Sequence, residues 1–263
     1  MYRCLYGGAF IRESIEAVST VAERVYVQVA ERPWGGVDGY LEDDFDGVPI
    51  PGGRRLAWPD RFDDLVERVS ETGATLYRRD HGHPHDSFGR AARDIVRQPD
   101  VWIFVEPDHV WDPEVLEAAL GQFVGSGWPC AYAPMIELWR RLDYAIPERP
   151  YRVGPVFWRG PVPETLCHGA SASSPTPPLQ HRCHNVGFAW PDQTVRWKHR
   201  ISLAVSGSIA DDQPRADWFR VWRDWKPEDR NLEPSAGHEY AIPCAEPIDV
   251  GTLPGALRAR LAS

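Results

Sequence analysis

The sequence predicts an α/β fold, and three observations support that prediction. In the first half, segments rich in β-branched and aromatic residues alternate with segments whose apolar residues recur at helical spacing. Glycine or acidic residues follow the strand-like segments of this half. The second half contains short β-like runs interrupted by Pro and Gly. This alternation is typical of a Rossmann-like, mostly parallel sheet flanked by helices, here joined to a smaller β-rich half.

The elements of the first half follow from local patterns. β-branched and aromatic runs predict strands at residues 2–8, 24–31, 74–80 and 101–105. Segments that place apolar residues on one helical face predict helices at residues 10–23, 60–73, 88–98 and 112–124. Asp60 and Asp112 stand where a side chain caps a helix N-terminus, and Pro113 suits the first helical position.

The second half is less regular. β-like runs occur at 130–160, 181–190 and 194–205, and the aromatic segment 216–225 is a helix candidate. Residues 161–180 are rich in Pro and Ser, which predicts a mobile loop that orders as a lid when a ligand binds. We expect residues 1–125 and 126–263 to form the two halves of one domain.

Composition and charge limit the classes of partner. The formal charge is −9, from 29 basic and 38 acidic residues, which argues against a nucleic-acid-binding protein. We find no apolar run of the roughly 20 residues that a membrane span needs, and no signal-peptide pattern at the N-terminus. The expectation is a cytoplasmic protein that contacts neither membrane nor nucleic acid, with its oligomeric state left open.

The segment "VWIFVEPDHVW" at 101–111 carries the clearest chemical signal. It runs apolar for five residues and then places Glu106 and Asp108 at the end of the expected strand. Ligands of α/β proteins bind at the carboxyl ends of such strands. Side-chain alternation along a strand would point both carboxylates to one side. Carboxylates there suit Mg²⁺ or Mn²⁺, which prefer oxygen ligands and leave positions for substrate phosphates.

Three stretches resemble the GT-A fold of nucleotide-sugar-dependent glycosyltransferases, and within it the family 2 enzymes. "RCLYGGAFIRESIEAVSTVAERVYVQV" resembles their opening strand and helix, and "FVEPDHVWDPEVLEAAL" resembles their D-x-D strand and the helix after it. "VRWKHRISLAV" is similar to their "WKHPVHE" segment. The resemblance implies a metal-dependent glycosyltransferase, with a nucleotide-sugar-binding half at 1–125 and an acceptor-binding half at 126–263.

The same resemblance implies roles for individual residues. Asp108 would be the principal ligand of Mn²⁺ or Mg²⁺, Glu106 would contact ribose or the metal through water, and His199 would be a late ligand of the metal or diphosphate. The implied nucleoside-binding residues are Gly7 and Ala9, which would line the base pocket, and Glu31 and Asp80.

Three further residues are candidates for the nucleotide site. His81 could line the nucleotide pocket, although the "HGHPHD" segment also fits a solvated turn. Arg90 and Arg93 lie one helical turn apart and could reach the diphosphate, or simply form a solvated helix face.

One departure from the family pattern affects catalysis. Leu203 stands where the family has a carboxylate, so the usual general base has no counterpart there. An inverting transfer needs a base within reach of the acceptor hydroxyl. The candidates for this catalytic role are Asp211, Asp212 and His184.

Two alternative functions stay open. A nucleotidyltransferase would share the fold and the metal, but it normally carries a basic, glycine-rich loop after the first strand, where "YGGAFIRES" offers only Arg12. The loss of the carboxylate at Leu203 also allows a degenerate, non-catalytic GT-A binding module. The favoured function is transfer of a sugar from a nucleoside diphosphate sugar to a small soluble acceptor.

Overall fold

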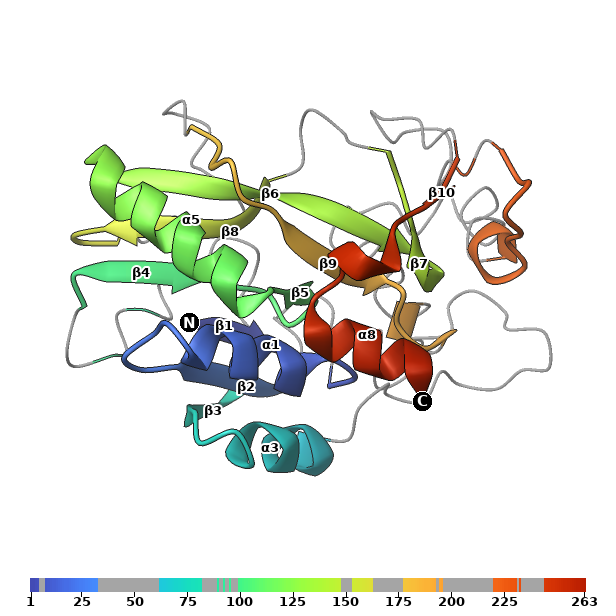
Figure 1. Cartoon of the computed structure of the whole chain (residues 1–263). Helices are drawn as coiled ribbons and strands as arrows, with labels where there is room; N and C mark the ends of the chain where they lie inside the picture. The colour runs from blue at the N-terminus through green and yellow to red at the C-terminus, as the bar shows by residue number, and fades with distance from the viewer. Residues whose placement is uncertain are drawn as a thin grey trace, which may run out of the picture.

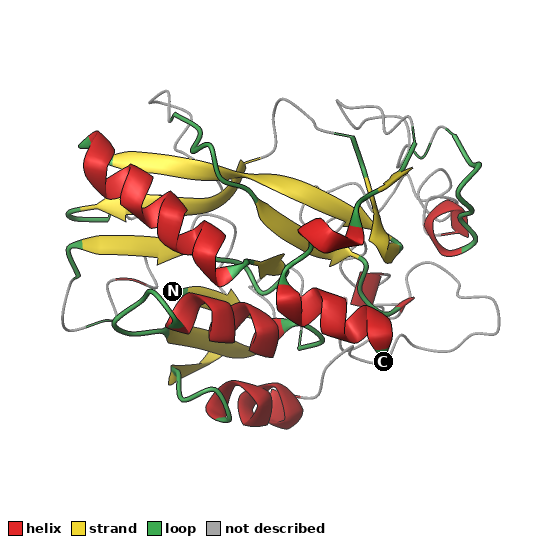
Figure 2. Cartoon of the chain, in the orientation of Figure 1, coloured by secondary structure: helices red, strands yellow, loops and turns green. Residues whose placement is uncertain are grey.

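The computed structural model has an α/β architecture in which helices pack against β-sheets (Figures 1 and 2). Helices α1, α5 and α8 lie on the side that faces the viewer in Figure 1. The structure describes residues 1–4, 8–32, 62–81, 89, 92, 95, 99–147, 153–162, 177–192, 194–195, 220–230, 232 and 244–263.

The first sheet is parallel, as predicted. It contains β1 (Tyr2–Cys4), β2 (Tyr26–Arg32) and β3 (Thr75–His81) in that order. The connections between its strands contain α1 (Ile11–Ser19) and α3 (Phe62–Ser70). Both helices bury the apolar face that the sequence periodicity predicts.

Strand β4 (Val101–Phe104) lies beside β1. Tyr2 and Val105 form a parallel bridge, and the Val105 amide donates to the Met1 carbonyl over 3.0 Å. Because these strands run in the same direction, the segments after β1 and β4 leave at the same edge, where α/β proteins bind ligands. Glu106 and Asp108 follow β4 at that edge.

The second sheet has seven strands among the described residues, and most of its pairings are antiparallel. Its main path runs β10-β7-β6-β8-β4, and β9 pairs with both β5 and β6. The strands not yet introduced are β5 (His109–Val110), β6 (Cys130–Trp139), β7 (Arg141–Ala145), β8 (Val153–Arg159), β9 (Cys183–Phe188) and β10 (Glu246–Pro247).

The prediction of a mostly parallel sheet is therefore correct for the first sheet, and the second sheet belongs mainly to the separate β-rich half that was expected. Strand β4, expected in the parallel sheet, pairs antiparallel with β8 as well. Strand β7 follows β6 directly after Arg140, whose φ is 59°. Such a short connection allows only an antiparallel return, because a parallel return needs a crossover of about a dozen residues or more. The Pro- and Gly-broken runs of the second half indicate a meander of this kind.

Helix α5 (Pro113–Ser126) begins as the sequence predicts. The Asp112 side chain accepts a hydrogen bond from the Glu114 amide over 3.1 Å, and Pro113 occupies the first turn. The helix ends at Gly127, whose φ of 71° places it in the left-handed region that favours glycine.

The C-terminal elements have no counterpart in the sequence-based prediction. They are a 3-10 turn, η2 (Val250–Thr252), and helix α8 (Gly255–Ala262). The two faces of α8 differ little in polarity, so its sequence carries no clear periodic signal.

Other predicted elements are described only in part. Ala92 and Ile95 are buried, as expected for the helix at 88–98. Residues 220–223 are helical, within the predicted segment 216–225. The β-like run at 194–205 is wrong at its start, where the Thr194 and Val195 amides both donate to the Pro191 carbonyl in a helical turn.

The end of the predicted mobile loop is tied to β6. The Leu179 amide donates to the Tyr132 carbonyl over 2.8 Å, and the Leu179 side chain is buried. The described end of this loop, residues 177–180, therefore contains a segment anchored to the sheet. Residues 163–176 lie outside the described residues, so the lid stays a prediction there.

The largest core cluster draws side chains from both halves of the chain. Phe157 from β8 is fully buried; its ring centroid lies 5.7 Å from that of Phe123 on α5 and 6.3 Å from that of Trp111. Ile15 and Val27, from the first sheet and its helix, belong to the same cluster. The two halves thus share one set of apolar contacts.

Gly154 on β8 marks a close approach to β6. A Cβ atom at this position would lie 2.5 Å from the Ala133 carbonyl oxygen and 2.5 Å from Cγ of Met135. Gly154→Ala is expected to lower the free energy of unfolding by about 1–3 kcal/mol, since one of these partners is backbone and cannot move away cheaply. Urea denaturation measures this change.

Gly121→Ala on α5 is the matched control. Nothing lies within 4 Å of a Cβ atom built there, so the same methyl group meets open space. Alanine in place of a helical glycine is expected to stabilise the protein by about 0.5–1 kcal/mol. Equal effects of the two alanines would contradict the close approach at Gly154.

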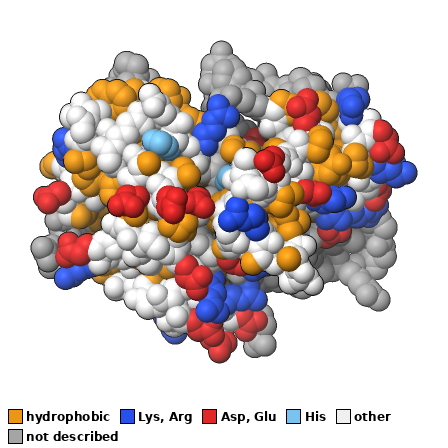
Figure 3. Space-filling view, in the orientation of Figure 1, with side chains coloured by type: hydrophobic (Ala, Val, Ile, Leu, Met, Phe, Trp, Pro, Cys, Tyr) orange, Lys and Arg blue, Asp and Glu red, His pale blue; other side chains and the backbone are white. Residues whose placement is uncertain are grey.

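The described residues can be checked for features that bind nucleic acid or cross a membrane. Acidic and basic side chains are interspersed on the face that carries α1, α5 and α8, so the described part of that face shows no broad basic area (Figure 3). Within the described part of the chain, every helix is too short or too polar to cross a bilayer.

Candidate functional site

The carboxylates after β4 lie in a turn. The His109 amide donates to the Glu106 carbonyl over 3.0 Å, which closes a turn across Pro107 and Asp108. The expectation that Glu106 and Asp108 point to one side of a continuing strand is therefore wrong. Strand β4 ends before Glu106, and a proline has no amide hydrogen to continue the pairing.

Glu106 forms an ion pair with Arg3 on β1. Its Oε1 lies 3.0 Å from Nη2 of Arg3, and the exposed fractions of the two side chains are only 16% and 12%. The pair joins the ends of two neighbouring parallel strands. The charge of Arg3 offsets that of Glu106. The role of Glu106 toward ribose or a metal stays a prediction.

Asp108 is buried at this turn, with a relative exposure of 6%. Its carbonyl accepts a hydrogen bond from the Val186 amide of β9 over 2.8 Å, which holds the turn against the second sheet. Its Oδ1 lies 3.8 Å from Nε2 of His109. Burial, and then the charge of Asp108, raises the pKa of the Cys183 thiol well above its usual value.

His109 is oriented by its own turn. Its Nδ1 accepts a hydrogen bond from the Glu106 amide over 3.2 Å, so a neutral His109 carries its proton on Nε2, the nitrogen nearest Asp108. The Ser14 hydroxyl on α1 donates to the His109 carbonyl, and Tyr2 from β1 shares a 2.8 Å hydrogen bond with that hydroxyl. The turn is thereby tied to both β1 and α1.

A row of buried polar residues crosses three neighbouring strands beside this turn. His109 on β5 is paired with Asn185 on β9, and Asn185 is paired with Glu137 on β6, so the three side chains share one face. The Asn185 side-chain oxygen accepts from the Gly187 amide over 2.7 Å. Its amide nitrogen contacts the Met135 sulfur at 3.6 Å.

Sequence reasoning missed His109 and Glu137 as members of this group. A signal for Glu137 exists, because it is the one acidic residue in the apolar run "CAYAPMIELW". Lone carboxylates in apolar runs are seldom buried unless they have a partner. The pairing of three strands, which the sequence does not reveal, brings the row together.

His184 faces the other side of β9. It is paired with Val110 on β5 and Ile136 on β6, and it is 5% exposed. Burial lowers the pKa of His184 from 6.5 to about 4, and the charge of Asp112 opposes this shift in part. Its Nε2 is buried and has no hydrogen-bond partner among the described residues. The role of His184 as a general base stays a prediction.

The remaining candidates are placed to different extents. Ala9 lies in the turn before α1, at the same edge as Asp108. The backbone ends of β2 and β3 are adjacent, because Ala30 pairs with Arg79 and Arg32 with His81, so Glu31 and Asp80 also reach this edge. Outside the described residues lie Gly7, Arg90, Arg93, His199, Asp211 and Asp212.

Of the described side chains near Asp108, only a single carboxylate is placed to bind a divalent cation. Among the described residues, no group of three or more His, Cys, Asp or Glu side chains is arranged to hold a metal ion. Mg²⁺ needs no such group, since it is often bound by one or two carboxylates together with substrate phosphates and water. Asp108 fits that mode as a single carboxylate.

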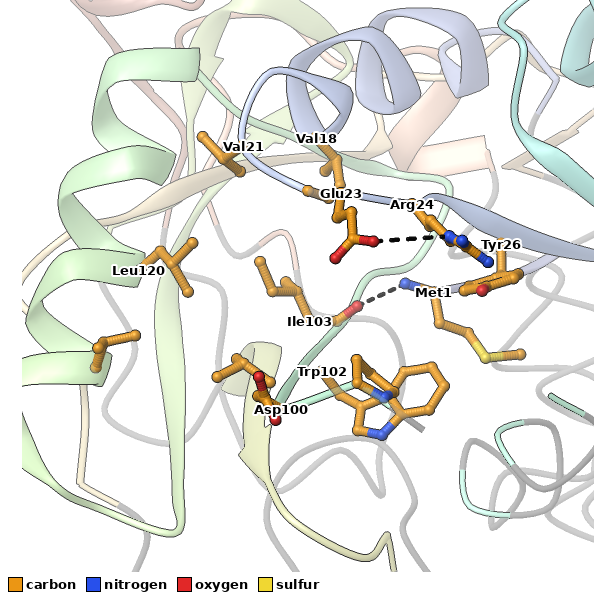
Figure 4. A pocket seen from close by; sticks show the side chains of 14 residues that line it. Met1, Val18, Val21, Glu23, Arg24, Tyr26, Asp100, Trp102, Ile103 and Leu120 are labelled. Atoms are coloured by element: carbon orange, nitrogen blue, oxygen red, sulfur yellow. Dashed lines mark hydrogen bonds and ion pairs between the residues drawn. The ribbon is translucent and has the colours of Figure 1, made fainter. Parts of the chain in front are cut away.

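A described pocket of about 340 Å³ lies elsewhere (Figure 4). It is formed by the end of α1, the start of β4 and one face of α5, and includes Val21, Trp102 and Leu120. At its wall the Met1 nitrogen donates to the Ile103 carbonyl over 2.7 Å. Because β4 runs from this pocket toward Asp108, the pocket lies at the opposite end of that strand.

Comparison with known proteins adds little. Neither a protein-family model nor a curated protein matches the chain. Among solved structures, the crystal structure of S. aureus TarS 1-349 matches with a TM-score of 0.39 at 10% identity. The match covers 78% of this chain and 64% of that chain. A likeness at this level carries neither a fold nor a function over to the present protein.

Proposed function

We propose that this protein is a glycosyltransferase of the GT-A type. It binds a nucleoside diphosphate sugar at the edge where β1, β2 and β4 end, and it transfers the sugar to a small soluble acceptor. The observation that supports this most is the buried Asp108 in the turn after β4, a turn that Ser14 of α1 holds through the His109 carbonyl. This is the edge at which α/β sheets bind their ligands.

Asp108 would hold Mn²⁺ or Mg²⁺ together with the diphosphate of the donor. When bound, the cation would offset the negative charge that develops on the departing nucleoside diphosphate. His109 would pack beside the Asp108 carboxylate, with Nε2 3.8 Å from Oδ1, beyond hydrogen-bond distance. Arg3 would balance the charge of Glu106. Asp211, Asp212 and His184 remain the proposed candidates for the base.

Titration calorimetry of Asp108→Asn tests the proposal. The wild-type protein is expected to bind at least one of UDP, GDP, CDP and ADP in the presence of Mn²⁺, and to lose that binding in EDTA. Asp108→Asn keeps the size of the side chain but removes its charge. It should weaken binding about 100-fold, since two unit charges about 4 Å apart interact by about 4 kcal/mol at an effective dielectric of 20, before screening.

Asp63→Asn is the matched control, because Asp63 is an exposed aspartate on α3, away from the turn. It should bind like the wild type. Equal binding by wild type and Asp108→Asn would overturn the role of Asp108. Preference for a nucleoside triphosphate would favour a nucleotidyltransferase. A wild type that binds neither class of nucleotide would favour a non-catalytic module.

A further inference from the structure

The start of α1 lacks the usual stabilisation of a helix N-terminus. Phe10 occupies the capping position, with φ −127°, and makes no side-chain capping hydrogen bond. The Ser14 amide donates to the Phe10 carbonyl over 3.1 Å, which forms the first turn. Helices without a capping side chain are less stable by about 1 kcal/mol, so this first turn needs support from elsewhere.

That support comes from Arg260, near the end of α8. Its Nη2 donates to the Ala9 carbonyl, and its Nε donates to the Glu13 carboxylate. Its guanidinium group also lies over the Phe10 ring, 4.6 Å from the centroid. One side chain therefore contacts the backbone, the ring and the acidic side chain of the same turn (Figure 1 shows α8 beside the start of α1).

The physical chemistry of these contacts makes arginine hard to replace. A guanidinium group is planar and has several donors in a fixed arrangement, so it can stack on a ring and donate to two acceptors at once. The side chain of Glu13 is 15% exposed, and its Oε2 has no hydrogen-bond partner among the described residues. Arg260 thus places a cation directly against this largely buried charge, and the charge of Arg12 also acts on it.

The same turn is linked to the candidate site. Ser14, in the first turn and a half of α1, donates to the His109 carbonyl, and His109 Nε2 faces Asp108. Ala9 belongs to the segment implied to line the base pocket. An altered start of α1 would therefore affect both the base pocket and the turn that carries Asp108.

We infer that Arg260 is a positioning residue that fixes residues 9–13, at the start of α1, for nucleotide binding. This inference rests on the proposed function for its ligand, but the positioning itself can be measured without one. Arg260 acts through Ala9, Phe10 and Glu13 rather than on the nucleotide. The C-terminal helix would in this way support the nucleotide site without contacting the nucleotide.

The first arm of the test measures amide hydrogen exchange in the absence of ligand. It compares the full-length wild type with the variants Arg260→Ala and Arg260→Lys. Arg260→Ala is expected to speed amide exchange in residues 8–15 by about tenfold or more, since local opening there loses three contacts. Arg260→Lys keeps the charge but not the planar donors, so it should restore protection only in part. Arg258→Ala is the control on the same helix, because Arg258 donates to the Gly251 carbonyl instead.

Calorimetry with Mn²⁺ and UDP, GDP, CDP or ADP is the second arm. Arg260→Ala should lower the affinity for whichever nucleotide the wild type binds by about tenfold. Arg258→Ala should bind that nucleotide with wild-type affinity. Two results for Arg260→Ala would overturn the inference and leave the proposed function intact. They are unchanged exchange in residues 8–15, and unchanged nucleotide affinity despite faster exchange. A wild type that binds none of these nucleotides overturns the proposed function and the nucleotide role of Arg260 with it.

Discussion

Phe157→Ala is expected to lower the free energy of unfolding by about 3–5 kcal/mol, the range for truncating a large buried aromatic side chain. Phe157 is fully buried and contacts Trp111 edge-on and Phe123 at a tilted angle. The alanine variant would leave a cavity bordered by both halves of the chain, because the surrounding cluster includes residues from each.

Urea denaturation followed by tryptophan fluorescence measures this loss, with Phe157→Leu as a graded comparison. Leucine fills more of the space, so its cost should be clearly smaller than that of alanine. Val124→Ala on α5 is the surface control: Val124 is 51% exposed, and its truncation should change stability by less than about 0.5 kcal/mol. A loss below about 1 kcal/mol for Phe157→Ala would contradict a core shared between the halves.

Acid is expected to destabilise the protein through His184. Burial lowers the pKa of His184 in the folded state to about 4, whereas its ordinary value is 6.5. Below pH 6.5 the unfolded chain binds a proton that the folded chain does not accept, so the unfolded state is favoured as the pH falls. The contribution of His184 to the free energy of unfolding is fully present above pH 6.5. It is lost as the pH falls to about 4, and the total loss is about 3 kcal/mol.

His184→Leu tests this linkage. Val110 and Ile136 flank His184, and its Nε2 has no hydrogen-bond partner among the described residues, so leucine should cost little at pH 7.5. The variant should then be more stable than the wild type at pH 5. His181→Leu, at a partly exposed position before β9, is the control. A pH dependence unchanged by His184→Leu would contradict the buried, neutral histidine.

The sequence was most informative where local physics decides the outcome. The helical periodicity of α1 and α3 and the β-rich run of β2 predict those elements because each places its apolar side chains on one face. Asp112 and Pro113 predict the start of α5, because a capping carboxylate and a proline act within a single turn. The apolar run before Glu106 likewise predicts a strand, which the structure has at β4.

Contacts between distant segments could not be predicted in this way. The turn at Pro107 is held by the Val186 amide of β9, which donates to the Asp108 carbonyl, and the pairing of β5, β9 and β6 brings His109, Asn185 and Glu137 into one row. Arg260 reaches Ala9 from the other end of the chain. Local patterns in the sequence specify which residues are apolar and where elements begin and end. Strand neighbours and ion pairs depend instead on the whole packed arrangement, since many pairings satisfy the same local pattern.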